Sequence, residues 1–275
     1  MSSSSSGKAL RLTRLSRRSD GRFLVVPLDH SVADGPIAAE HRFHELVREV
    51  AEGGADAVVV HKGRARNLDP SVLRNTALVV HLNASTGLAR DANAKVMVGA
   101  VEDALRLGAD AVSVQVNVGS DTEAAQLADL GAVAGACDRW GMPLMAMAYP
   151  RGPRISDPHD PALIAHVVNI AADLGADLVK TTWSTPVDAL ADVVASSPVP
   201  VLVAGGPAGS GDITAYAEDV MAAGCAGLAV GRRVFNDPDP YQTVRQLASI
   251  IHSGHKMLAP ASSISLSAQV LAGTR

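Results

Sequence analysis

The sequence predicts a single-domain α/β protein built as a closed (β/α)8 barrel, the TIM-barrel class. Eight short runs rich in β-branched residues alternate with longer segments rich in alanine and leucine. The chain has 275 residues, which is near the length of about 250 residues typical of this fold. Hydrophobic residues make up 47% of the chain but aromatic residues only 3%. An aliphatic core of this kind suits helices packed on a buried parallel sheet.

The eight expected strands follow one another along the whole chain. Short apolar runs bounded by glycine, proline or polar residues are typical of buried parallel strands. The expected strands cover residues 23–30, 57–63, 77–83, 111–119, 143–149, 178–183, 201–206 and 227–232. Helical patterns lie between them, for example over residues 39–54, 93–108 and 160–175. An open doubly wound sheet is the alternative, and it is disfavoured because no strand leads through a GxGxxG turn into a helix.

A repeated signal supports the strand count. A glycine stands just before each even-numbered strand, in GGADAVVV (53–60), GADAVSV (108–114), GADLVKT (175–181) and GCAGLAV (224–230). Glycine at such a point ends a helix in a left-handed conformation. The apolar run that follows is then expected to enter the barrel.

The barrel domain is expected to occupy residues 21–257. Residues 1–20 are expected to form a flexible N-terminal tail, and their start, MSSSSSG, lacks the hydrophobic region of a secretory signal. Residues 258–275 come after the last expected helix and are interpreted as a loose C-terminal tail or an oligomer contact.

The composition excludes several classes of protein. The net charge is −4 and the basic residues cluster only in RLTRLSRR (11–18), so nucleic-acid binding is not expected. No apolar run approaches the roughly 20 residues that span a bilayer, so no membrane contact is expected. Cys137 and Cys225 lie far apart in apolar segments and are interpreted as small core residues of a reducing compartment. These features together predict a cytoplasmic protein.

Polar residues gather at the carboxyl ends of the expected strands, where barrels of this class carry their chemistry. In strand order they are Asp29 and His30, His61 and Lys62, His81 and Asn83, Gln115 and Asn117, Tyr149, Lys180 with Thr181 and Trp183, Gly205 and Gly206, and Gly231 and Arg232. This pattern predicts a functional site at one end of the barrel.

Lys180 interrupts an otherwise apolar strand. Apolar surroundings favour the neutral form of an amine. A neutral lysine amine can attack a ketone and form a Schiff base, which is an electron sink for carbanion chemistry. Alternatively, Lys180 reaches solvent or pairs with a carboxylate such as Asp29. The pattern alone leaves both interpretations open.

Asp29 and Tyr149 are the expected partners of such a lysine, because imine chemistry needs groups that move protons. A structural hydrogen bond for Asp29 and a half-buried tyrosine at the barrel rim are the alternatives. The stretches VAGGPAGSGD (203–212) and VGRRVF (230–235) are glycine-rich turns after the last two strands. Such turns form the usual phosphate site of these barrels, and Arg232 adds a bidentate partner. Tight turns without a ligand are the alternative.

A metal site is not expected. His30, His61 and His81 stand at strand ends, but no HxH or HExxH spacing accompanies them and few carboxylates stand nearby.

Eight stretches of the chain, in order and through nearly the whole barrel, resemble one family. The family is that of the class I aldolases that includes archaeal-type fructose-bisphosphate aldolase and 2-amino-3,7-dideoxy-D-threo-hept-6-ulosonate synthase. The stretches are VPLDHSVADGPI (26–37), VVHKG (59–63), VVHLNAST (79–86), LGADAVSVQVNVGS (107–120), MAMAYPRG (145–152), LVKTTW (178–183), VAGGP (203–207) and AVGRRVF (229–235).

The resemblance implies a role for each matching position. Lys180 would form the imine, Tyr149 would donate a proton and Asp29 would accept one. The phosphorylated substrate would be held by the loop of His30, Ser31, Val32 and Ala33, by Arg151, and by Gly205, Gly206, Gly231 and Arg232. His61, Lys62 and Arg151 are candidates for meeting the carboxylate of an amino-acid aldehyde. No cofactor is expected, because the imine on Lys180 does the chemistry.

The resemblance also implies a reaction, in which dihydroxyacetone phosphate joins L-aspartate 4-semialdehyde to give a seven-carbon amino keto phosphate for aminohydroxybenzoate-type secondary metabolism. Three other enzymes remain open: fructose-bisphosphate aldolase, which needs a second phosphate site; the transaldolase-type heptulosonate synthase of the 3-dehydroquinate pathway; and an acyltransferase of autoinducer breakdown that transfers an acetyl group to coenzyme A. A non-catalytic sugar-phosphate-binding protein is a fourth possibility.

Two positions depart from the family pattern. Relatives often carry DHG where this chain has Ser31 in DHS, and the segment PAGSGD lacks the lysine or threonine common there. These departures leave the details of phosphate contact open. Because relatives commonly form rings, a homo-oligomer is expected.

Overall fold

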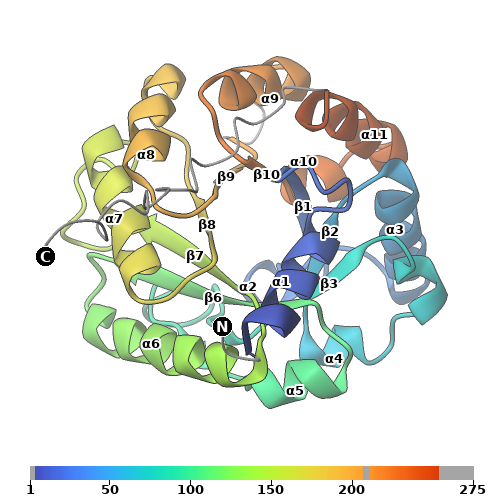
Figure 1. Ribbon diagram of the computed structural model, residues 1–275, viewed down its shortest axis with the longest axis horizontal. Helices are drawn as coiled ribbons and strands as arrows, with labels where there is room; N and C mark the ends of the chain where they lie inside the picture. The colour runs from blue at the N-terminus through green and yellow to red at the C-terminus, as the bar shows by residue number, and fades with distance from the viewer. Residues whose placement is uncertain (1–3, 207–210, 254–275) are drawn as a thin grey trace, which may run out of the picture.

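The computed structural model describes residues 4–206 and 211–253, and the expected C-terminal tail over residues 258–275 lies outside them. Eight parallel strands close into a barrel in the order β1-β10-β9-β8-β7-β6-β3-β2 (Figure 1). The strands are β1 (Phe23–Pro27), β2 (Ala57–His61), β3 (Ala77–His81), β6 (Ala111–Val118), β7 (Leu144–Pro150), β8 (Leu178–Thr181), β9 (Val201–Ala204) and β10 (Gly227–Ala229). The predicted TIM barrel and all eight of its strands are therefore confirmed.

Helices surround the barrel as an outer ring (Figure 1). The α-helices are α1 (Ser4–Leu15), α2 (Ser31–Asp34), α3 (Glu40–Gly53), α4 (Lys62–Ala65), α5 (Val101–Arg106), α6 (Glu123–Trp140), α7 (Pro161–Asp173), α8 (Leu190–Ser196), α9 (Ile213–Ala222), α10 (Arg232–Phe235) and α11 (Pro240–Ile251), and two 3-10 turns are η1 (Pro70–Leu73) and η2 (Val187–Ala189). The expected helices over 39–54 and 160–175 correspond to α3 and α7.

Successive residues of each strand point into two separate hydrophobic clusters. On β1, Phe23 and Val25 face the barrel interior, whereas Leu24 and Val26 pack against the outer helices. This alternation follows from the two-residue period of a strand. It means that any polar side chain at an inward position of a strand end faces the mouth of the barrel.

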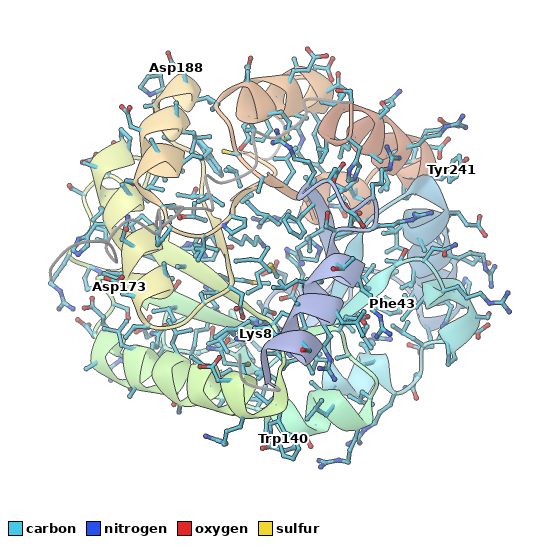
Figure 2. The ribbon with its side chains drawn as sticks, viewed as in Figure 1. Lys8, Phe43, Trp140, Asp173, Asp188 and Tyr241 are labelled. Carbon is cyan, nitrogen blue, oxygen red and sulfur yellow. The ribbon has the colours of Figure 1, made fainter. Side chains whose placement is uncertain are left out.

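The expectation of a flexible N-terminal tail is wrong over residues 4–15, which form α1. Leu15 is 3% exposed and belongs to the cluster inside the barrel. Lys8 pairs with Asp138 at 2.7 Å and with Asp177 at 3.1 Å, and it lies on the face of α1 near the middle of Figure 2. The helix closes the amino end of the barrel with an apolar side chain and is fastened there by ion pairs.

The helix expected over residues 93–108 is also only partly correct, because α5 begins at Val101. Residues before it form a small antiparallel pair, β4 (Asn83–Ala84) with β5 (Val96–Met97). Val96 and Val98 are exposed while Met97 packs inward, which is the alternation of a strand. The excursion between β3 and α5 is therefore a hairpin at the carboxyl end of the barrel.

The repeated glycines have the expected conformation, since Gly54, Gly108, Gly175 and Gly224 all have positive φ. The aspartate that follows three of them has a role that the pattern did not indicate. Each carboxylate accepts an N–H from the first or second residue of a neighbouring strand: Asp56 from Leu24 at 2.6 Å, Asp110 from Leu78 at 3.1 Å and Asp177 from Leu144 at 2.8 Å. These carboxylates satisfy N–H groups that strand pairing leaves without partners.

One buried ion cluster joins the last helix to the amino end of the barrel. His252, directly after α11, places Nδ1 at 2.7 Å from Asp20 and Nε2 at 3.0 Å from Asp56. The side chains of His252 and Asp56 are fully buried. Burial lowers the pKa of His252, but the hydrogen bonds and charges of Asp56 and Asp20 outweigh it and raise the pKa above 6.5. The imidazolium can then donate to both carboxylates.

We predict that His252→Gln lowers the free energy of unfolding by about 3 kcal/mol at pH 6, because Asp56 would lose its buried cationic partner. Because the pKa of His252 is raised in the folded state, its protonated form stabilises the fold fully below pH 6.5. This contribution is lost as the pH rises through the raised pKa. The deficit of the variant should therefore shrink by pH 9. Urea denaturation at both pH values measures it, with His166→Gln on the exposed face of α7 as the control. Equal deficits at both pH values would contradict the assignment.

Candidate active site

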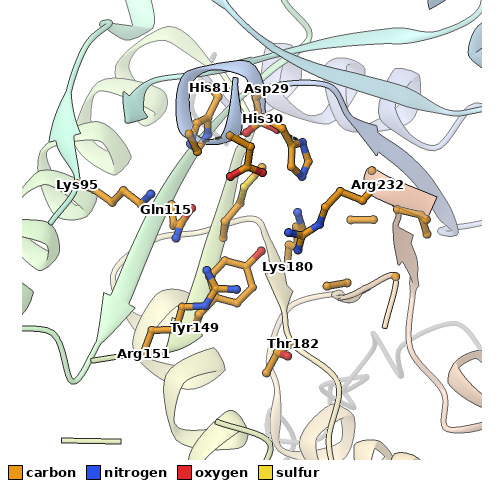
Figure 3. Close-up of a pocket in the computed structure, with 18 of the residues that line it drawn as sticks. Asp29, His30, His81, Lys95, Gln115, Tyr149, Arg151, Lys180, Thr182 and Arg232 are labelled. Atoms are coloured by element: carbon orange, nitrogen blue, oxygen red, sulfur yellow. Dashed lines mark ion pairs between the residues drawn. The ribbon is translucent and has the colours of Figure 1, made fainter. Parts of the chain in front are cut away.

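A cavity of about 420 Å³ opens at the carboxyl ends of the strands. Figure 3 shows Asp29, His30 and His81 on one side of it and Tyr149 with Arg151 on the opposite side. Lys180 and Arg232 lie on one flank between these groups, and Lys95 and Gln115 lie on the other. The cavity therefore combines side chains from strands that are far apart in the sequence.

Lys180 faces this cavity because of the strand alternation on β8. Leu178 belongs to the inner cluster and Val179 to the outer one, so Lys180 turns inward again. It is 8% exposed. No ion pair joins its ammonium to a carboxylate in the part of the chain that the structure describes, and Asp29 pairs instead with imidazoles. The ion pair between Lys180 and Asp29, which the sequence left open as an alternative to imine chemistry, is therefore not formed.

Asp29 lies among histidines. Its carboxylate is 3.4 Å from Nδ1 of His30 and 4.0 Å from Nε2 of His81. Burial by itself raises the pKa of Asp29, but the charges that His81 and His30 can carry outweigh it and hold the pKa below 3.8. Asp29 is therefore ionised at neutral pH and can accept a proton.

The three imidazoles around Asp29 are neutral at neutral pH. Burial lowers the pKa of His81 to about 4, although the Asp29 carboxylate acts in the opposite direction. Burial likewise lowers the pKa of His30 and of His61. His81 is oriented by Ser113, whose hydroxyl lies 2.8 Å from Nδ1. His61 directs Nδ1 to the backbone oxygen of His81 at 3.2 Å, so its other ring nitrogen is an acceptor.

Tyr149 occupies the same inward column of β7 as Met147, one step nearer the mouth. It is 5% exposed, and in Figure 3 its hydroxyl points into the cavity. The guanidinium of Arg151 lies 4.3 Å from the ring centroid, a cation–π contact that holds the arginine at the cavity. β7 pairs with β8, with Met147 opposite Lys180, so the phenol and the amine come from neighbouring strands.

The two glycine turns are shaped by close packing. A Cβ on Gly231 would lie 2.6 Å from Cε1 of His30 and 2.9 Å from the oxygen of Pro27, so only glycine fits there. Gly206 has φ +75°, and its N–H donates to the oxygen of Ala204 at 2.7 Å. That N–H is therefore not free for a ligand.

Adjacent arginines on α10 divide two tasks. Arg233 donates to the oxygens of Gly211 at 2.7 Å and Gly205 at 3.4 Å, which holds the turn after β9 in place. Arg232 is exposed and lines the cavity. Among the described residues it has no hydrogen-bond or ion-pair partner. Its guanidinium can therefore bind an anionic ligand.

Most of the residues expected at the site meet in the cavity. Those that line it are Asp29, His30, Val32, Ala33, His61, Tyr149, Arg151, Lys180, Gly205, Gly206, Gly231 and Arg232. Ser31 and Lys62 are not among its lining residues. Lys62 is directed away because it begins α4, and its ammonium pairs with Asp103 at 3.2 Å. Lys62 is therefore corrected from a substrate contact to a surface ion pair.

Several lining residues were missed in the sequence. They include Lys95, His159 and Thr182, whereas His81, Gln115 and Trp183 are among the strand-end residues that the sequence pointed to. Lys95 is hidden in a segment whose pattern favours helix. Trp183 stacks on His159 with ring centroids 4.2 Å apart, and its backbone oxygen accepts from Nδ1 of His159 at 2.9 Å. This pair forms one wall of the cavity.

Within residues 4–206 and 211–253, no group of three or more His, Cys, Asp or Glu side chains is arranged to hold a metal ion. None of the helices in the described chain combines the length and apolarity needed to cross a membrane.

A buried lysine that faces the mouth of a closed barrel, beside an ionised carboxylate and a phenol, defines an enzyme of imine chemistry. The chain belongs to the DeoC/LacD family of aldolases, which it matches over residues 23–237. Membership makes it a class I aldolase, a lyase that works through a Schiff base.

The chain is similar to named members of known enzyme groups. The chain is 53% identical to 2-amino-4,5-dihydroxy-6-oxo-7-(phosphonooxy)heptanoate synthase of Streptomyces griseus, over 90% of both chains. It is 42% identical to 2-amino-3,7-dideoxy-D-threo-hept-6-ulosonate synthase of Halobacterium salinarum, over 90% of this chain and 92% of that one. A solved Schiff-base-forming fructose-1,6-bisphosphate aldolase is 28% identical, with TM-score 0.81 over 89% of this chain and 100% of that chain.

We predict that the imidazole of His81 stays neutral from pH 8 to pH 5.5 and titrates near pH 4, because burial lowers its pKa to about 4. Asp29→Asn should lower this pKa further, since the carboxylate acts to raise it. The ¹⁵N signals of the ring measure both effects, with Asp34→Asn in the same loop as the control. A midpoint above pH 6 in the wild-type protein would contradict the assignment.

Proposed function

We propose that this aldolase joins dihydroxyacetone phosphate to L-aspartate 4-semialdehyde and produces a seven-carbon amino keto phosphate. The observation that carries the proposal is the 53% identity to the heptanoate synthase of Streptomyces griseus over 90% of both chains. The inward Lys180, with Asp29 and Tyr149 across the cavity, supplies the groups that the chemistry needs.

Lys180 is the nucleophile. Its neutral amine attacks C2 of the ketone, the nitrogen loses a proton and the carbonyl oxygen gains one, which gives a carbinolamine. The hydroxyl then leaves as water and an iminium remains. The iminium withdraws electrons from C3, so a C3 proton is lost and an enamine forms. The enamine attacks the aldehyde carbon, whose oxygen takes up a proton, and water hydrolyses the imine to free Lys180.

Tyr149 and Asp29 move the protons. Tyr149 donates the proton with which the carbinolamine hydroxyl leaves as water, since its phenol points into the cavity. Asp29 is held ionised and accepts the proton that the attacking amine gives up. The neutral imidazoles of His30 and His81 leave the negative charge of Asp29 in place at neutral pH, which preserves its capacity as a base.

Arg232 and the turns at Gly205–Gly206 and Gly231 bind the phosphate of the donor. Arg232 offers a guanidinium that no described residue occupies, and it lies on the same flank of the cavity as Lys180 (Figure 3). A dianionic phosphate suits the planar donor edge of arginine. This arrangement places the phosphate at one end of the substrate and the reacting carbons near the centre of the cavity.

Trapping of the imine tests the donor. We predict that borohydride with dihydroxyacetone phosphate attaches the reduced three-carbon phosphate to Lys180, as read by peptide mass, because reduction converts the imine to a stable amine. Lys180→Met, which keeps a chain of similar length, should show neither the adduct nor activity. An absent adduct in the wild-type protein, or activity retained in Lys180→Met, would overturn the imine role of Lys180.

A panel of donors and acceptors, read by the mass of the product, then distinguishes the reaction from its rivals. Only a six-carbon bisphosphate would identify a fructose-bisphosphate aldolase. A product formed solely from a deoxyhexodiulose phosphate donor would identify the transaldolase-type heptulosonate synthase, the second rival. Acetyl transfer to coenzyme A would place the protein in another class.

The proton-donor role of Tyr149 is tested by removing its hydroxyl. We predict that Tyr149→Phe lowers kcat about 100-fold or more with little change in KM, which is the size expected for loss of a positioned acid. Tyr241→Phe on α11 is the control, because this tyrosine lies on the outer ring of helices, away from the cavity. Unchanged kcat in Tyr149→Phe would contradict the role.

A further inference from the structure

Lys95 is a further cation at the cavity. It stands just before β5 in the hairpin that rises over the carboxyl end of the barrel, and it lines the cavity. Its ammonium donates to the hydroxyl of Ser85 at 2.6 Å. That hydroxyl donates in turn to the oxygen of Ala92 at 2.6 Å. Ser85 is thereby fixed as an acceptor and orients Lys95.

Buried amides hold the hairpin that carries Lys95. Asn83 exchanges two hydrogen bonds with the backbone of Gln115, at 2.8 and 2.9 Å. The backbone oxygen of Asn93 accepts from the side chains of Asn117 and Gln126, both at 2.9 Å. Asn83, Asn117 and Gln126 are at most 1% exposed. Buried polar side chains are costly unless they are fully hydrogen-bonded, and here the network fixes the excursion at Asn83 and at Asn93, two residues before Lys95.

Lys95 on one flank of the cavity and Arg151 on the adjoining side (Figure 3) bring two positive charges within electrostatic range of each other. Burial lowers the pKa of Lys95, and the charge of Arg151 lowers it further, against the opposing effect of Asp29 and Asp34. Among the described residues, neither side chain forms an ion pair with a carboxylate. Two like charges held together in a partly buried place attract an anion that enters the cavity.

The position of this pair matches one part of the proposed reaction. If phosphate binds at Arg232 and C2 bonds to Lys180, the enamine carbon attacks toward the opposite flank. The tail of the aldehyde would then extend toward the part of the cavity that Lys95 and Arg151 line. Lys62 is held outside the cavity by Asp103. Lys95 therefore takes the role of carboxylate contact that the sequence suggested for Lys62.

We propose that Lys95, oriented by Ser85 and assisted by Arg151, binds the carboxylate of the acceptor aldehyde and selects aldehydes that carry a carboxylate over those that lack one. The inference rests on the proposed function, since it concerns the acceptor of that same site. It assigns substrate selection to the hairpin, an element separate from the strand ends that carry the chemistry.

The test compares Lys95→Met with Lys95→Arg and with Arg90→Met, which removes an exposed charge from the same excursion outside the cavity. The acceptors are L-aspartate 4-semialdehyde, 4-oxobutanoate and the neutral butanal, each with dihydroxyacetone phosphate. In Lys95→Met we expect KM for the two carboxylate aldehydes to rise about 10- to 100-fold, the value of a charge-assisted hydrogen bond. The values for butanal should not change.

Lys95→Arg should recover most of the preference for carboxylates, and Arg90→Met should behave as the wild-type protein. A structural role alone would change all three aldehydes together and would overturn the inference. So would an unchanged ratio of carboxylate to neutral acceptor in Lys95→Met.

Borohydride trapping with dihydroxyacetone phosphate separates this result from failure of the proposed function. Trapping should be intact in Lys95→Met, because the donor does not reach Lys95. If the wild-type protein traps no adduct, the proposed donor is wrong. If trapping is intact but acceptor preference is unchanged, only the role of Lys95 is wrong.

Discussion

The two-residue alternation of the parallel strands determines the rest of this molecule. It sends Leu178 and Lys180 to the same side of β8, so that one closes the interior and the other reaches the mouth. Because β7 follows the same rule, Tyr149 stands one step beyond Met147, which is paired with Lys180. Lys180 and Tyr149 are thus held by the barrel wall, whereas Asp29 lies just beyond the end of β1. Sites built on strands are more exact than sites built on loops.

Burial decides which groups around the Lys180 amine carry a charge. Three imidazoles surround Asp29, yet burial keeps them neutral near pH 7, and the pKa of His81 falls to about 4. Asp29 is therefore the ionised carboxylate that we propose as the proton acceptor of the cavity. Cations of the rim, Arg232 on one flank and Arg151 on the other, are left for anionic groups of the substrates. General acid–base chemistry and anion binding are thereby kept at different places in one cavity.

Local patterns predicted what local physics decides. The β-branched runs and the glycines with positive φ located all eight strands, and the strand ends named most of the cavity. Three features depend on distant contacts and were not predictable. The serine-rich start of α1 gives no helical signal, although Leu15 packs inside the amino end of the barrel. Lys62 pairs with Asp103 outside the cavity. Lys95 lies in a segment with a helical pattern, but hydrogen bonds from Asn117 and Gln126 hold that segment in another conformation.

The close approach of Gly231 to His30 brings the loop after the first barrel strand against the turn after the last one. β1 pairs with β10, and this pairing completes the barrel. A Cβ added to Gly231 would lie 2.6 Å from Cε1 of His30, across this pair of strands. The turn proposed to hold phosphate and the loop of Asp29 are therefore brought together only when the last strand has docked on the first. Enzymatic competence during folding or synthesis cannot precede ring closure. A ribosome-bound chain that still lacks β10 would have the lysine, the phenol and the carboxylate, but no assembled site.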